Sequence, residues 1–284
     1  MSNFFRRCIS WLVLVVVLFV ILYPPYQMLI LSIRPYADIT AYISIIENSM
    51  LRFIPSYFLP TAVSFEQYVN VLNSTLLRAY LVSVIYVTAI TALHFPFALV
   101  IGLVFAKVRF KGRDTLFFLF IAAMVLPFHV TVVPLNQIFN RINLFDSPWA
   151  VILLGVFSPL GVFLFKQFIS QVPDDVLEAA MIDGAGLFII IKFIILPMIH
   201  PGLAVFFLLT IVLQWSAIEP SMALIRNEQW WPVSLRLSAM MNSNMSEIFA
   251  PGVIYALPVL LVSVGVMSLS SSNIKGTLDK TRES

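Results

Sequence analysis

The sequence predicts an all-α integral membrane protein with six transmembrane helices and both termini in the cytoplasm. Of its 284 residues, 60% are hydrophobic and only 11% are charged, whereas soluble domains carry about 25% charged residues. That shortage of charge excludes an ordinary soluble globular protein. Because a spanning helix takes roughly 20 apolar residues, the whole chain, residues 1–284, is expected to form a single transmembrane domain.

Six stretches of about 18 residues or more contain no Asp, Glu, Lys or Arg, and each is long enough to cross a bilayer as a helix. A charge at the centre of a spanning helix costs about 2.5–3.5 kcal/mol, so six uncharged stretches are energetically coherent. The predicted spans cover residues 11–33, 79–106, 115–140, 147–165, 201–218 and 251–272.

The positions of Lys and Arg predict the orientation. Arg6 and Arg7 precede the first span, four cations crowd residues 107–113, and three follow the sixth span. Positive residues are retained on the cytoplasmic side, so the outer side receives two longer loops, about residues 34–78 and 219–250. The first span resembles a secretory signal, but no small-residue cleavage site follows it, so we expect an uncleaved anchor.

Prolines fall in most of the predicted spans. Each removes a backbone donor and bends its helix, a feature that transporters use beside a cavity. Proline is also common in ordinary membrane helices, so both interpretations stay open. The prolines are Pro24, Pro25, Pro96, Pro127, Pro134, Pro159 and Pro258.

The segment between the fourth and fifth spans, about residues 170–200, is predicted to be cytoplasmic and to contain a short helix. Pro173 suits a first helical turn, and the two aspartates after it favour the positive end of the helix dipole. Glu178-Ala179-Ala180 continues the helix, and Gly184 with Gly186 ends it.

The spacing in this segment resembles the EAA loop in permease subunits of binding-protein-dependent ABC importers. Glu178-Ala179-Ala180 is followed after three residues by Gly184, and then by Ile194 and Leu196-Pro197. The flanking Val172-Pro173 and the run 182–185 are similar to the carbohydrate-type, MalG-like branch. The resemblance covers most of the chain and implies a type I ABC importer permease fold.

The resemblance also implies that residues 178–184 form a coupling helix docked in a separate ATPase subunit. Glu178 would accept a hydrogen bond from that subunit, Ala179 and Ala180 would allow close approach, and Gly184 would make the turn, with Asp183 in the same segment. The alternative is a capped amphipathic helix at the membrane surface.

No G-x-x-x-x-G-K-[ST] phosphate loop occurs in the sequence. ATP is therefore expected to be bound by partner subunits, and the chain is expected to be a transport subunit without its own cofactor or ATPase site. The resemblance implies two ATPase subunits, a second and related permease, and an extracytoplasmic solute-binding protein as partners. The expected location is the cell membrane, and no nucleic acid is expected because the cations lie beside apolar runs.

A carbohydrate, either an oligosaccharide or a polyol, is the expected cargo, with a glycerol phosphate or a small nitrogenous solute as alternatives. Sugars stack on aromatic rings and form hydrogen bonds around the rim. The candidate pathway residues are therefore Trp215, Glu219, Asn136, Gln137 and Asn140, although an interfacial aromatic belt with ordinary interfacial polar residues is the favoured explanation for them. Similar permeases often carry Asn after this Trp, whereas this chain has Ser216-Ala217-Ile218-Glu219.

Two other classes of protein explain less of the sequence. A gradient-driven secondary transporter would use intramembrane histidines, here His94, His129 and His200, but it gives no reason for the 178–197 loop. A membrane enzyme would need paired acids or a metal cluster. The one acidic cluster, residues 174–183, is already explained by helix formation and docking, and no metal site is predicted.

Overall fold

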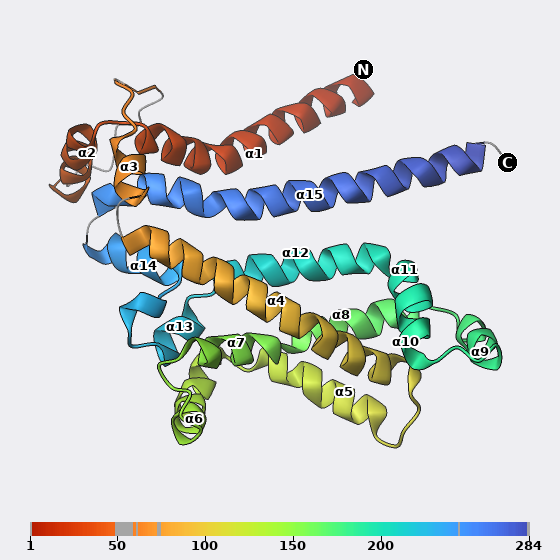
Figure 1. Ribbon diagram of the computed structural model, residues 1–284. Coiled ribbons are helices and arrows are strands. Elements are labelled where there is room, and N and C mark those ends of the chain that lie inside the picture. The colour runs from red at the N-terminus through yellow and green to blue at the C-terminus, as the bar shows by residue number, and fades with distance from the viewer. Residues whose placement is uncertain (1, 49–58, 61, 73–74, 244, 283–284) are drawn as a thin grey trace. The chain divides into compact units, whose positions relative to one another are not determined.

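The computed structural model describes residues 2–48, 59–60, 62–72, 75–243 and 245–282 (Figure 1). These residues contain helices and connecting segments and no strand. They form two compact units. Unit 1 comprises Met1–Arg78 and Arg236–Leu257, and unit 2 comprises Ala79–Leu235 and Pro258–Ser284.

Unit 1 is built on the first helices of the chain and on the segment before the last one. Its helices are α1 (Ser2–Ser32), α2 (Tyr36–Asn48), α3 (Glu66–Leu72), the larger part of α14 (Val233–Ser243), the 3-10 turn η4 (Met245–Glu247) and the beginning of α15 (Phe249–Arg282). In the described residues of the predicted outer loop, residues 34–78, the structure therefore has α2, α3 and the first residues of the helix Thr75–Lys107. Gln67 Nε2 donates to the carbonyl oxygens of Leu31, Ser32 and Arg34 at 3.0–3.1 Å. Such bonds satisfy the carbonyls that a helix end leaves unpaired.

Unit 2 begins within α4 (Thr75–Lys107) and contains most of the remaining helices. They are α5 (Arg113–Ala122) with η1 (Ala123–Val125), α6 (Phe128–Arg141), α7 (Pro148–Val156), α8 (Pro159–Ser170), α9 (Asp174–Ile182), α10 (Leu187–Ile190), η2 (Ile191–Ile195), α11 (Leu196–Met198), α12 (His200–Ser216), α13 (Glu219–Leu224) and η3 (Glu228–Trp230), followed by the start of α14 (Val233–Ser243).

The helices long and apolar enough to cross a membrane agree with the predicted spans in number. Four of them qualify singly in the described residues, at Ile9–Ser32, Thr75–Lys107, Pro148–Ser170 and Phe249–Val266. Two bent helix pairs raise the number to as many as six. The fold class is therefore the one that the sequence predicts, although the side of the membrane on which each terminus lies stays a prediction.

The structure differs from the prediction within residues 115–140, which do not form one continuous helix. Arg113–Val125 and Phe128–Arg141 meet at an angle of 101°. Pro127 lies at the corner in an extended conformation, with φ −60° and ψ 133°. Proline has no backbone donor and disfavours helical geometry in the residue before it. By contrast, α4 continues through Pro96 and α15 through Pro258.

Aromatic side chains form the centre of unit 2. Phe165 on α8 and Phe206 on α12 are fully buried, and their ring centroids lie 4.7 Å apart. On α4, a Cβ added at Gly102 would lie 2.5 Å from Cβ of Phe165. The absence of a side chain at Gly102 therefore permits the close contact of α4 with α8, as small residues do between membrane helices.

Candidate functional site: the α9 helix and a cavity between broken helices

The α9 helix has well-defined ends. Pro173 precedes it in an extended conformation, and Gly184 follows it with φ +82°. The Gly184 amide donates to the carbonyl of Met181 at 3.1 Å, and the Ala185 amide donates to that of Ala180 at 3.0 Å. This pair of bonds is the Schellman motif, which favours glycine at the left-handed position. The predicted short helix and its termination at Gly184 thus occur in the structure.

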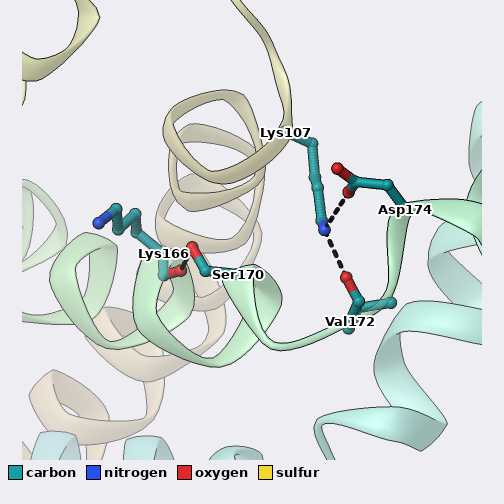
Figure 2. Close-up of polar contacts among 5 residues, drawn as sticks. All are labelled: Lys107, Lys166, Ser170, Val172 and Asp174. Atoms are coloured by element: carbon teal, nitrogen blue, oxygen red, sulfur yellow. Dashed lines mark hydrogen bonds and ion pairs between the residues drawn. The ribbon is translucent and has the colours of Figure 1, made fainter.

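A lysine ties the start of α9 to the end of α4. Lys107 Nζ donates to the carbonyl oxygen of Val172 and to Oδ1 of Asp174, both at 2.5 Å (Figure 2). The hydrogen bond from Lys107 and its positive charge lower the pKa of the Asp174 carboxyl. Because Lys107 is the last residue of α4, these bonds connect the start of α9 to the end of a long helix.

One side of α9 is anchored in the apolar core of unit 2. Leu177 is 7% exposed and belongs to the same buried cluster as Val172, Phe165 and Phe206. Ala180 is half-buried and packs against that cluster. The inner face of the helix is therefore fixed by burial. Ala180, one of the two alanines expected to contact a partner subunit, lies on this inner face.

The other side of α9 is open. Glu178, Ala179, Asp183 and Gly184 are exposed, so four of the five predicted docking residues lie on an accessible surface. Ile182 is 85% exposed, and the neighbouring Val176 and Met181 are also exposed. Sequence analysis missed these apolar residues as part of the surface. Their position beside the spacing motif of residues 178–184 was the available signal, and large exposed apolar side chains mark interaction sites.

The chain after α9 leads directly to α12. The turn at Gly184 is followed by α10, by a five-residue π-helix (η2, Ile191–Ile195) and by α11, and the segment Leu187–Met198 meets α12 at 84°. Ile190, Ile195 and Ile199 are buried in the core cluster. Figure 1 shows α9 and α13 at opposite ends of unit 2, and α12 runs between them. Packed residues therefore connect α9 with α12.

A cavity of about 620 Å³ lies where three helices of unit 2 are interrupted. Its lining includes the corner between α5 and α6, the break between α7 and α8, and the end of α12 with the start of α13. Interrupted helices beside a cavity are typical of transporter binding sites. The side chains that line it are Leu126, Phe128, Thr131, Leu154, Phe157, Ser158, Leu213, Gln214, Ser216 and Glu219, together with seven others.

The structure separates the five predicted pathway residues. Glu219 lines the cavity, whereas Trp215 is 4% exposed and is not a lining residue. Asn136, Gln137 and Asn140 lie on α6 outside the lining, and Nδ2 of Asn140 donates to the carbonyl of Asn136 at 2.7 Å. Gln214 and Ser216, the direct neighbours of Trp215, line the cavity instead.

The three histidines lie on different helices of unit 2. His129 and His200 are exposed, at the starts of α6 and α12. His94 on α4 is buried; its Nδ1 lies 2.7 Å from the carbonyl oxygen of Val156, and its ring stacks on Phe206 with centroids 5.3 Å apart. His94 thus binds a carbonyl next to the α7–α8 break.

Comparison with known proteins agrees with this architecture. Residues 98–272 match the family described as "Binding-protein-dependent transport system inner membrane component". The arabinooligosaccharides transport system permease protein AraQ of Halalkalibacterium halodurans is 23% identical over 264 residues, which cover 90% of this chain and 91% of the relative. The diacetylchitobiose uptake system permease protein NgcG of Streptomyces coelicolor is 28% identical and covers 72% of this chain and 71% of its own length.

A further relative and a solved structure extend the comparison. The sn-glycerol-3-phosphate transport system permease protein UgpE of Yersinia enterocolitica is 32% identical over 140 residues, covering 49% of this chain and 46% of the relative. A chain of a bacterial ABC transporter involved in the import of the acidic polysaccharide alginate has the same fold, with a TM-score of 0.78, 20% identity and coverage of 94% and 97%. The chain belongs to the family of binding-protein-dependent transport system inner membrane components, the permease subunits of ABC importers.

Proposed function

We propose that this permease subunit imports a carbohydrate, either an oligosaccharide or a polyol, by lining half of a translocation pathway that separate ATPase subunits drive. Two relatives named for arabinooligosaccharides and diacetylchitobiose support this cargo class. A glycerol phosphate is the second candidate, because UgpE is 32% identical to part of the chain. The complete importer would contain two ATPase subunits, a related second permease and an extracytoplasmic solute-binding protein, with both termini of this chain in the cytoplasm.

The geometry of α9 is the observation that carries the proposal. The helix is fixed to the core by Leu177 and to α4 by Lys107, and it presents Glu178 and Ile182 on its open side. A helix that only lay on the membrane would direct its apolar side into lipid. Here the apolar Leu177 points into the protein core, and the open side combines the Glu178 carboxylate with exposed apolar residues, as a protein interface does.

Coupling follows from the two fixed connections of α9. One end is bonded to α4, and the other continues through buried residues into α12, whose last turn lines the cavity. ATP binding or hydrolysis in a docked subunit would move α9 and shift the permease between two packings with different access to the cavity.

Reversal of the charge at Glu178 tests the proposal. We expect Glu178→Arg to insert normally but to lose co-purification with the ATPase subunit and to lose uptake, because it presents a cation to a basic partner group. Asp114→Arg is the matched control, since Asp114 is 88% exposed at its side chain and lies on α5, outside the docking segment. Normal co-purification and normal uptake by Glu178→Arg would remove α9 as the docking element.

A further inference from the structure

We infer that the cavity of unit 2 selects against anionic cargo and that Glu219 is the residue that sets this selectivity. The inference rests on the proposed function, because it narrows the cargo of the same pathway to uncharged or amine-bearing polyhydroxylated solutes. It concerns the charge inside the cavity, whereas the proposed function depends on α9 at the other end of the unit.

The charge of the cavity comes from one residue. Glu219 is the only ionisable side chain among the described residues that line it. The carboxylate is exposed, and in the described part of the chain no Lys, Arg or His forms an ion pair with it. An unneutralised carboxylate attracts cations and repels anions within a few ångströms, more strongly in a confined site than in open water.

Two of the three hydroxyl groups that line the cavity, those of Thr131 and Ser216, add acceptors rather than donors. Oγ1 of Thr131 donates its proton to the carbonyl of Phe128 at 2.7 Å, and Oγ of Ser216 donates to that of Val212 at 2.9 Å. A hydroxyl has one proton to donate, so both oxygens offer only lone pairs to a ligand. A phosphate or carboxylate has no donor for them, whereas a sugar hydroxyl or an ammonium group does.

The apolar part of the lining fits the face of a sugar ring. Phe128 and Phe157 line the cavity together with Leu126, Leu154 and Leu213. Binding sites of this kind combine an apolar wall with a few orienting polar groups. Gln214 is the one lining side chain that supplies both donors and acceptors from an amide, which suits a hydroxyl without favouring an anion.

The inferred preference differs from the cargo for which two similar proteins are named. The solved neighbour belongs to a transporter of an acidic polysaccharide, and UgpE is named for a phosphate ester. Both solutes carry negative charge. The lining of the cavity in this chain predicts the opposite preference, and therefore argues for a neutral or basic sugar rather than for glycerol phosphate.

Thiol reactivity inside the cavity measures this selectivity without knowledge of the cargo. Cys8 is the only cysteine in the sequence, so Cys8→Ser with Ser216→Cys gives one reporter among the lining residues. In the full-length permease, its rates of modification are compared for a trimethylammonium-ethyl and a sulfonato-ethyl methanethiosulfonate. We expect the cationic reagent to react faster, relative to their rates with a free thiol, and Glu219→Gln to reduce this preference by about tenfold.

Two further reporters keep the test decisive. Ser158→Cys reports from the α7–α8 break on another wall of the cavity, so the result does not depend on the fold of one variant. Ser170→Cys, at the exposed end of α8 and outside the lining, should show no effect of Glu219→Gln. A preference that Glu219→Gln leaves unchanged at both cavity positions would overturn the inference, and the docking result for Glu178→Arg would still stand by itself.

Transport by the complete importer tests the cargo class. We expect uptake of arabinotriose or diacetylchitobiose and no uptake of glycerol 3-phosphate. Uptake of glycerol 3-phosphate by the wild-type importer would overturn the assigned selectivity even if the thiol reporters showed a negative cavity.

Discussion

Replacement of His94 by leucine should destabilise the broken-helix region of unit 2. Nδ1 of His94 lies 2.7 Å from the carbonyl oxygen of Val156, and the residue is 2% exposed. A carbonyl oxygen only accepts, so Nδ1 must carry the proton. Because α7 ends at Val156 and α8 begins at Pro159, this bond joins α4 to the interruption that helps to form the cavity.

The expected loss follows from the position of the bond. Leucine retains an apolar side chain but cannot donate, and the buried Val156 carbonyl would lose this partner. An unsatisfied buried acceptor costs about 1–3 kcal/mol, and Val156 is itself buried. We therefore expect the free energy of unfolding to fall by about 1–3 kcal/mol, equivalent to a roughly 5- to 150-fold larger unfolded fraction.

Denaturant titration in mixed micelles measures this change. His200→Leu is the matched control, since His200 is exposed at the start of α12, and its effect should stay within about 0.5 kcal/mol. Gly161→Ala supplies an independent test, because a Cβ at Gly161 would overlap the His94 ring. If His94→Leu were as stable as His200→Leu, the hydrogen bond from His94 to Val156 would not stabilise the interruption between α7 and α8.

Two further predictions concern α9. Gly184→Val should weaken co-purification of the ATPase subunit, because a β-branched residue is strained at φ +82°. Gly186→Val is the control and should bind the ATPase subunit normally, since Gly186 has φ −71°. Equal binding by both variants would contradict the role of the turn. Lys107→Met should speed hydrogen exchange in 174–182 at pH 7, whereas Lys192→Met should not. Lys107 lowers the pKa of Asp174, so the stabilisation of α9 by this ion pair is present above the ordinary carboxyl pKa and is lost as the pH falls through the lowered value. Unchanged hydrogen exchange in Lys107→Met would contradict the attachment of α9 to Lys107.

The sequence predicted α9 well because local signals determine it. A proline, two acids and a glycine at the left-handed position define both ends, and the structure places the helix at Asp174–Ile182 with Gly184 after it. The tether from Lys107 was not predicted. In the sequence Lys107 indicated only the cytoplasmic side of a span, because its contact with Asp174 joins residues 67 positions apart.

The cavity was harder to predict for a related reason. Counting charges defines a span but not its interruption, and only one of several prolines, Pro127, produces the corner between α5 and α6. The orientation of Trp215 also depends on how α12 packs. Its ring is buried, so its neighbours Gln214 and Ser216 line the cavity, and an aromatic residue alone could not indicate which face of the helix is open.

Cross-linking of α9 to the ATPase subunit is the most direct test of α9 as the coupling helix. Ile182 is 85% exposed, so Ile182→Cys in a Cys8→Ser chain offers a single thiol at the centre of the expected interface. We predict that a short photoactivatable thiol reagent at this position forms an adduct with the ATPase subunit in the assembled importer, and that a membrane-impermeant reagent added outside intact cells does not reach the thiol. Labelling from outside, or an assembled importer without the adduct, would contradict the assignment of α9 as the coupling helix.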